Sequence, residues 1–171
     1  MPLSTYDASV GLLLKGLNSL NAILTKAEEH AQAKELNVDD YVTAKLCEDM
    51  FALNFQVYMA VDTATKCVAR LLGTEPAEWK REETSFAALR KKTTDAIEIL
   101  KKVDPEAVEG KEVNTVTMGI GPGKTKTLSA KEYITSYSVP NYFFHLQTTY
   151  AILRHKGVPV GKLDYLTSFS S

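Results

Sequence analysis

Cysteine and histidine are scarce in this sequence. Its 171 residues include 2 cysteines and 3 histidines. Cys47 and Cys67 form no CxxC pair and have no neighbouring histidine, so we expect both to be reduced and structural. Any imidazole chemistry is limited to His30, His145 and His155. His30 belongs to a charged helical face and His155 to a predicted helix C-terminus, which leaves His145 as the best-placed candidate.

Long apolar runs and an excess of one charge are also missing. No uninterrupted apolar stretch could span a bilayer, and residues 1–7 lack the basic and apolar regions of a signal peptide. Lysine and arginine number 20 against 21 acidic residues, for a formal net charge of -1. No basic stripe with interleaved aromatic residues is present. We therefore expect a cytoplasmic protein that binds neither nucleic acid nor membrane. The length and the 44% hydrophobic content fit a single domain over residues 1–171.

Motifs of common enzyme classes are absent as well. The glycine-rich segment 119–125 resembles a phosphate-binding loop, but Met118 stands where the pattern needs glycine, so we interpret the segment as a hairpin turn. There is no Gly-x-Ser-x-Gly elbow and no His-Glu-x-x-His pair. Hydrolase chemistry of these kinds therefore has no support in the sequence.

Helical periodicity is the strongest signal that is present. Apolar residues recur at three- and four-residue steps, and Ser-x-x-acid capping patterns at Ser4 and Ser129, with Gly73 as a stop, delimit helices. Two short strand-like runs, 113–118 and 125–128, flank the glycine-rich turn, and Pro140 should kink the last helix. Residues after 162 show no periodicity, and Trp79 is expected to fold back onto the bundle. The predicted helices span about 5–34, 48–72, 85–103 and 129–155. This pattern predicts an all-α fold, a four-helix bundle with a small β-hairpin between helices three and four.

The segment 138–155 sets polar side chains into an apolar helix. At 100° per residue Asn141, His145 and Thr148 share one stripe. A buried imidazole bonded to a carbonyl or carboxylate would be purely structural. Alternatively, His145 is a general acid/base, because its unperturbed pKa of about 6.5 is close to working pH.

Partners for His145 are expected on the second helix. Either Asp49 or Asp62 could orient the imidazole as a catalytic carboxylate. The other candidate site residues would contact the substrate: Gln56, Tyr58, Asn141, Thr149 and Tyr150. Two functional classes follow. The first is a cofactor-free small-molecule enzyme, an isomerase, cyclase or lyase that moves protons. The second is a non-catalytic module that binds a small organic molecule or mediates dimerisation. The second and fourth helices carry more apolar residues than one core-facing stripe needs, which predicts a homodimer.

Two segments resemble a known family. Residues 46–62 (LCEDMFALNFQVYMAVD) and 140–157 (PNYFFHLQTTYAILRHKG) are similar to the domain-of-unknown-function family nineteen ninety-three, a branch of the DinB/YfiT-like superfamily. The resemblance covers Tyr6 to about Leu166. It implies a DinB/YfiT-like four-helix bundle with a hairpin before the last helix. It also implies a frequent tendency to dimerise.

Metal-binding members of that superfamily hold a divalent ion through three histidines, and several members are thiol-dependent transferases or isomerases. A metal-dependent transferase is therefore a further alternative. The resemblance places the three ligands near Gln56, His145 and either Asn141 or Thr149. Only one of these is histidine, and amides or hydroxyls are weak ligands for metals such as zinc. We therefore expect neither metal nor cofactor.

Overall fold

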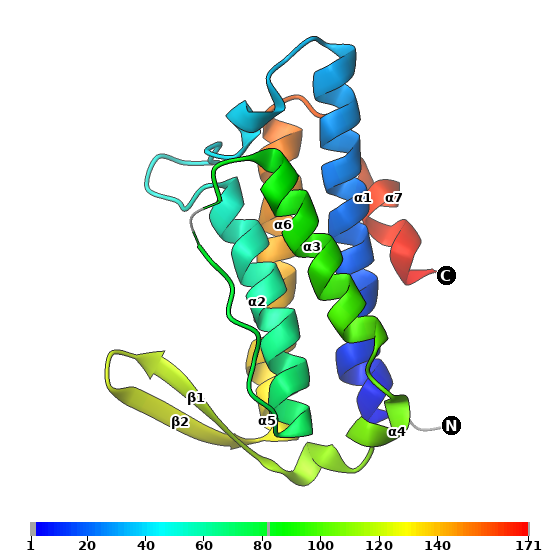
Figure 1. The fold of residues 1–171 in the computed structure, drawn as a ribbon, viewed down its shortest axis with the longest axis vertical. Helices are drawn as coiled ribbons and strands as arrows, with labels where there is room; N and C mark the ends of the chain where they lie inside the picture. The colour runs from blue at the N-terminus through cyan, green and yellow to red at the C-terminus, as the bar shows by residue number, and fades with distance from the viewer. Residues whose placement is uncertain (1–2, 82, 171) are drawn as a thin grey trace.

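Four long helices lie side by side as a bundle in the computed structural model, which describes residues 3–81 and 83–170 (Figure 1). They are α1 (Leu12–Ala33), α2 (Leu53–Leu72), α3 (Phe86–Lys101) and α6 (Val139–His155). α2 packs against both α3 and α6, and α1 packs against the same two helices. Their apolar stripes meet in one core, which confirms the predicted all-α bundle. Among its fully buried members are Leu17, Leu20, Leu53, Val57, Leu89, Leu100, Leu146 and Ile152.

Local capping chemistry sets most helix ends where the sequence predicts them. The Ser85 hydroxyl accepts a hydrogen bond from the Ala88 N–H at the start of α3. Ser129 and Glu132 form a capping box that opens α5 (Ala130–Tyr133). Gly73 ends α2 with φ of 70°, a left-handed conformation that glycine adopts without a Cβ penalty. Helix one is extended at its start by a π-helical turn, Asp7–Gly11.

The predicted start of the second helix is wrong. α2 begins at Leu53 instead of Glu48, because the chain before it folds back on a 3-10 turn, Val38–Tyr41. Backbone bonds fix this return: the Leu53 N–H donates to the Ala44 carbonyl and the Asn54 N–H to the Val42 carbonyl. The segment 43–52 is therefore a loop. Asp49, assigned to the helix from the sequence, lies exposed in this loop.

The predicted fourth helix is divided into three parts. α5 is followed by a π-helical turn, Ile134–Ser138, and then by α6, in which Pro140 occupies the second position. Proline lacks an N–H and clashes with the preceding turn. The helix irregularity expected at Pro140 is therefore a wider π turn directly before it.

A hairpin and two short helices complete the chain. β1 (Thr115–Gly121) pairs antiparallel with β2 (Lys124–Ser129), and the hairpin projects from the bundle beside α5 (Figure 1). Both strands are longer than predicted, so the turn shrinks to Pro122 and Gly123, with an irregularity between Gly119 and Gly121. α4 (Pro105–Val108) precedes the hairpin. α7 (Lys162–Leu166) packs against α1; at five residues it is too short to show periodicity.

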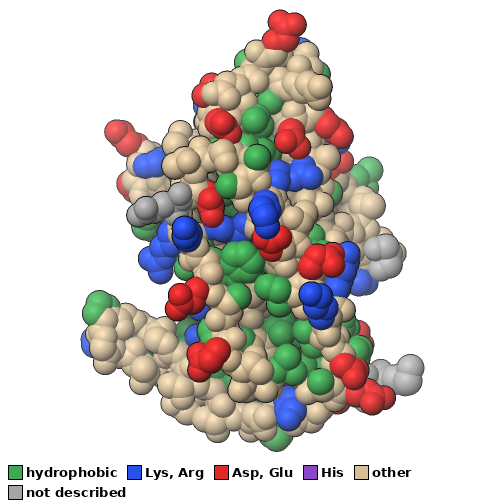
Figure 2. Space-filling view, viewed as in Figure 1, with side chains coloured by type: hydrophobic (Ala, Val, Ile, Leu, Met, Phe, Trp, Pro, Cys, Tyr) green, Lys and Arg blue, Asp and Glu red, His purple; other side chains and the backbone are tan. Residues whose placement is uncertain are grey.

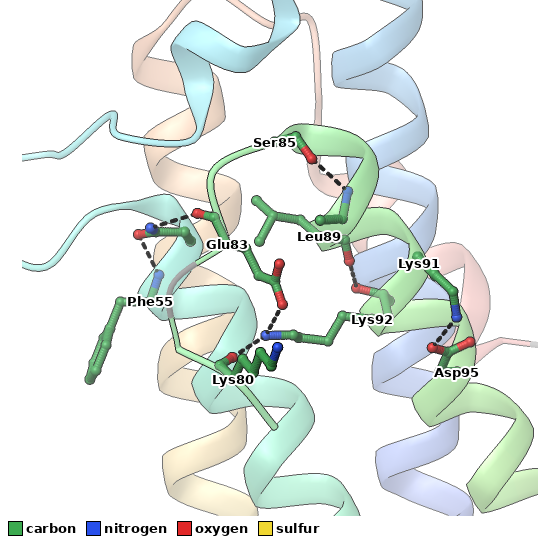
Figure 3. A network of polar contacts seen from close by, with 11 residues as sticks. Phe55, Lys80, Glu83, Ser85, Leu89, Lys91, Lys92 and Asp95 are labelled. Carbon is green, nitrogen blue, oxygen red and sulfur yellow. Dashed lines mark hydrogen bonds and ion pairs between the residues drawn. The ribbon is translucent and has the colours of Figure 1, made fainter. Parts of the chain in front are cut away.

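An extended strap, residues 74–81 and 83–85, joins α2 to α3. The Trp79 indole N–H donates to the Thr65 hydroxyl over 2.9 Å, so the predicted return of this side chain to the bundle is confirmed. The buried Lys92 ammonium pairs with the Glu83 carboxylate at 2.9 Å and donates to the Lys80 carbonyl (Figure 3). No helix in the described ranges is long and apolar enough to cross a membrane.

Candidate functional site

His145 and Gln56 form a polar pair between α6 and α2. The imidazole Nδ1 lies 2.8 Å from Gln56 Oε1, and both side chains are buried. The Gln56 amide nitrogen donates to the Phe51 carbonyl over 3.0 Å, which fixes the orientation of the amide. Because Oε1 can only accept, Nδ1 must carry the proton. The second nitrogen, Nε2, therefore keeps its lone pair.

Burial keeps this imidazole neutral. Desolvation lowers the pKa of His145 from its ordinary 6.5 to about 4. No carboxylate among the described residues forms an ion pair with it. At neutral pH His145 is therefore a hydrogen-bond donor at Nδ1 and an acceptor at Nε2.

Two phenyl rings contact the imidazole and a third stacks on one of them; we call the three rings the aromatic face. Phe144 meets His145 edge-on with ring centroids 5.1 Å apart, and Phe55 does so at 6.2 Å. Phe51 stacks on Phe55 at 4.1 Å. Phe51 is 65% exposed and Phe144 58%, although both are large apolar side chains.

The Nε2 atom of His145 is open to solvent. It makes no hydrogen bond to any described residue, and it is not among the fully buried atoms that lack a partner. Solvent therefore reaches it, although only 7% of the residue is exposed. The arrangement offers a neutral proton acceptor on a ring that is flanked by Phe55 and Phe144.

Two predicted site residues lie near His145 but are already engaged. The Asn141 amide donates to the Thr63 hydroxyl over 2.8 Å, and the Thr149 hydroxyl donates to the backbone carbonyl of His145 over 2.9 Å. The first bond joins α6 to α2, and the second lies within α6. Asn141 is half-buried and Thr149 is fully buried.

The other predicted residues are not brought to the imidazole. Asp49 is exposed in the loop before α2. The Asp62 carboxylate pairs with Lys66 at 2.7 Å. Tyr58 lies under the strap with Lys92 at 5.4 Å from its ring centroid. Tyr150 lines a separate hollow of about 660 Å³, and its hydroxyl approaches the Val160 carbonyl at 3.4 Å.

Comparison with known proteins places the chain in a family. The profile of the family described as "Domain of unknown function (DUF1993)" matches residues 5–166. The chain belongs to the DUF1993 family. The crystal structure of a DinB family member protein from Shewanella denitrificans is similar, with 36% sequence identity and a TM-score of 0.83. The match covers 94% of this chain and 90% of that chain. No curated protein matches.

The DinB-like fold raises the question of a metal, and this DUF1993 chain does not fit one. At the positions that correspond to the three ligands, the side chains are engaged in hydrogen bonds within the protein. Gln56 bridges His145 and Phe51, while Asn141 is held by Thr63. No group of three His, Cys, Asp or Glu side chains that could hold a metal occurs within residues 3–81 and 83–170. The Gln56–His145 hydrogen bond links α2 and α6 directly.

The sequence analysis missed the charged cluster under the strap. Lys92 is 5% exposed, and its ammonium is bound by the Glu83 carboxylate and the Lys80 carbonyl. The sequence does indicate that this lysine is buried, because it lies three residues after Leu89 and next to Thr93 on the buried side of α3.

On the same side of the molecule, apolar side chains gather between the lower halves of α2 and α3 (Figure 2), where a hollow of about 560 Å³ lies. His145 lines neither this hollow nor the one beside Tyr150.

Proposed function

We propose that this DUF1993 protein binds a planar organic molecule that carries a hydroxyl or N–H group. The molecule would lie on the aromatic face and donate a hydrogen bond to His145. One observation carries the proposal: Nδ1 is committed to Gln56, while the Nε2 lone pair has no partner among the described residues and is accessible to solvent.

The chemistry of the surroundings supports this class of ligand. Aromatic rings favour stacked or edge-on contacts with flat partners. A hydrogen bond between neutral groups contributes about 0.5–1.5 kcal/mol, and leaving a buried acceptor unpaired costs more. The site therefore favours a flat molecule with one correctly placed donor over the same molecule without it.

Proton-transfer catalysis by His145 is the second candidate. An isomerase, cyclase or lyase needs a base with a free lone pair, and Nε2 meets that requirement. The lowered pKa makes the imidazole a weak base at neutral pH, whereas an efficient general base has a pKa near the working pH. Asp49 and Asp62, the predicted orienting carboxylates, lie away from it. These features favour binding over catalysis.

Equilibrium binding of two probes tests the proposal. 1-Naphthol has the ring system and one hydroxyl, and naphthalene has the ring system alone. We expect wild-type protein to prefer 1-naphthol by about two- to tenfold, the value of one neutral hydrogen bond. His145→Phe should abolish the preference for 1-naphthol. Phe144→Ala, which removes an exposed ring, should weaken the binding of both probes. Equal affinity of wild-type protein for the two probes, or no binding of either, would overturn the proposal.

A further inference from the structure

The hollow of about 660 Å³ beside Tyr150 lies where the end of α6 meets α1 and α7. Tyr150 and Arg154 are four residues apart on α6, so both line it from one face of that helix. Lys26 lines it from α1, and residues 159–164 line it from the segment that leads from α6 to α7, which lies beside α1 (Figure 1). His145 does not line this hollow, so it is separate from the ligand site proposed above.

The loop that forms one wall of the hollow is held in place. Gly157 closes the end of α6 with φ of 89°, a left-handed conformation that favours glycine. The Val158 N–H then donates to the Leu153 carbonyl over 3.0 Å. Val158 and Val160 are fully buried. Buried side chains and backbone hydrogen bonds therefore fix the shape of this wall.

Among the described residues, Asp164 is the only acid that lines the hollow, and both of its carboxylate oxygens are occupied. Oδ1 accepts a hydrogen bond from the Lys26 ammonium over 2.8 Å, and Oδ2 accepts one from the Gly161 N–H over 2.7 Å. The charges of Lys26 and Asp164 therefore cancel within the protein.

Two other cations line the hollow without such a partner. Arg154 and Lys162 are exposed, and neither forms an ion pair with a described residue. They leave the lining with a net charge of +2. Just outside it, Glu29 and Lys156 are exposed with opposite charges and do not change this balance. A concave surface of one sign concentrates ligands of the other sign, here anions.

Tyr150 adds an aromatic wall to this charged hollow. Its ring meets the Tyr165 ring edge-on with centroids 6.1 Å apart, and its hydroxyl lies 3.4 Å from the Val160 carbonyl. The side chain remains half-buried, so part of it stays accessible. Aromatic rings favour stacked or edge-on contacts with other rings. The wall therefore suits a ligand that carries a flat apolar group next to its negative charge.

We propose that this hollow binds the phosphate monoester of an aromatic compound. Such a group carries a charge of about -1.5 to -2 at neutral pH, which matches the two unpaired cations. The Arg154 guanidinium would donate paired hydrogen bonds to two phosphate oxygens, and Lys162 would supply the second charge. The aromatic group would lie against Tyr150. The inference goes beyond the proposed function, because it assigns a second ligand to another face of α6.

Calorimetric titration with three probes tests the ligand class. Phenyl phosphate has the ring and the dianion, inorganic phosphate lacks the ring, and benzoate has the ring with a single charge. We expect wild-type protein to bind phenyl phosphate more tightly than inorganic phosphate by about two- to tenfold, the value of one aromatic contact. Benzoate should bind more weakly than phenyl phosphate. No binding of phenyl phosphate, or equal affinity for it and either of the other probes, would overturn the proposal.

Substitutions at exposed positions test the two cations without threatening the fold. Arg154→Gln and Lys162→Gln should each weaken phenyl phosphate binding by about tenfold or more. Lys156→Gln removes a cation at the same end of α6 but outside the hollow; as the matched control, it should change the affinity by less than about twofold, because solvent and salt screen its charge. Equal losses in the Arg154 and Lys156 variants would overturn the site. His145→Phe should leave phenyl phosphate binding unchanged, so the two proposed sites fail or succeed separately.

A membrane lipid is a second source of the same phosphate group. Leu163, next to Lys162, is exposed, and phosphatidic acid presents a phosphate monoester beside apolar chains. Co-sedimentation with phosphatidylcholine vesicles that contain phosphatidic acid distinguishes the two sources. We expect the protein to stay in solution with these vesicles and to bind phenyl phosphate. Vesicle capture that Lys162→Gln abolishes, without binding of phenyl phosphate, would overturn the soluble aromatic ligand.

Discussion

His145 gives the folded protein a pH dependence that one substitution can isolate. Burial lowers the pKa of the imidazole to about 4, against 6.5 when it is solvated in the unfolded chain. The unfolded state therefore takes up this proton first as the pH falls. The stability that the neutral imidazole contributes is fully present above about pH 6.5 and is lost as the pH falls toward about 4.

The two pKa values set the size of the effect. Linkage gives a loss of about 3 kcal/mol in unfolding free energy once the pH is below both values. Between pH 7 and pH 5 the same relation gives a loss of about 2 kcal/mol. Acidification also destabilises the fold through three carboxyls whose pKa is lowered by hydrogen bonds: Glu112, Glu132 and Asp164. Their contribution cancels when two variants are compared.

The comparison is between wild-type protein and His145→Asn in urea unfolding at pH 7, 6 and 5. Asparagine places an amide N–H near the position of Nδ1 and can keep the bond to Gln56, but it does not titrate. Wild-type protein should lose about 2 kcal/mol more than the variant over this range. His155→Asn, at an exposed position of α6, controls for loss of an imidazole. Parallel pH profiles for wild-type protein and His145→Asn would refute the reasoning.

Two further predictions concern stability. Lys92→Met should cost about 2 kcal/mol in urea unfolding and speed hydrogen exchange in the strap, because it leaves the Glu83 carboxylate beneath the strap without its cation. Lys91→Met, which breaks an exposed pair in the same helix, should change little, and equal effects would contradict the burial argument. Gly16→Ala would place a Cβ in steric conflict with the Tyr142 ring, so calorimetry should show a loss of about 1–3 kcal/mol in unfolding free energy. A more stable variant would show that the α1–α6 contact is looser than described.

Helix ends with local capping chemistry were predictable from the sequence. Ser85, Gly73 and Ser129 act within four residues of themselves, so their patterns define boundaries without tertiary information. The start of α2 was not predictable in this way. Phe51 continues the apolar pattern of the helix, but tertiary backbone bonds hold its segment as a loop, and Asp49 leaves the helix with it.

The imidazole was located from the sequence, but its partner was misassigned. Periodicity shows which side chains share a face of one helix, whereas the stagger between two helices depends on how they pack. That stagger sets Gln56 against His145, while Asp62 pairs with Lys66 one turn along its own helix. Tyr150 lies five residues beyond His145 on α6, which turns it to another face and another hollow. The register of Lys92 in α3 indicates burial, but its partner Glu83 lies in a segment without periodicity, so the pairing could not be predicted.

The most direct test of the central claim is the protonation state of each imidazole nitrogen of His145 at pH 7. Long-range proton–nitrogen NMR spectra of wild-type protein and His145→Asn assign the ring and distinguish its forms. We predict a neutral ring with the proton on Nδ1 and a bare Nε2 whose nitrogen signal moves when 1-naphthol is added. A proton on Nε2, or a charged imidazolium at pH 7, would contradict the account.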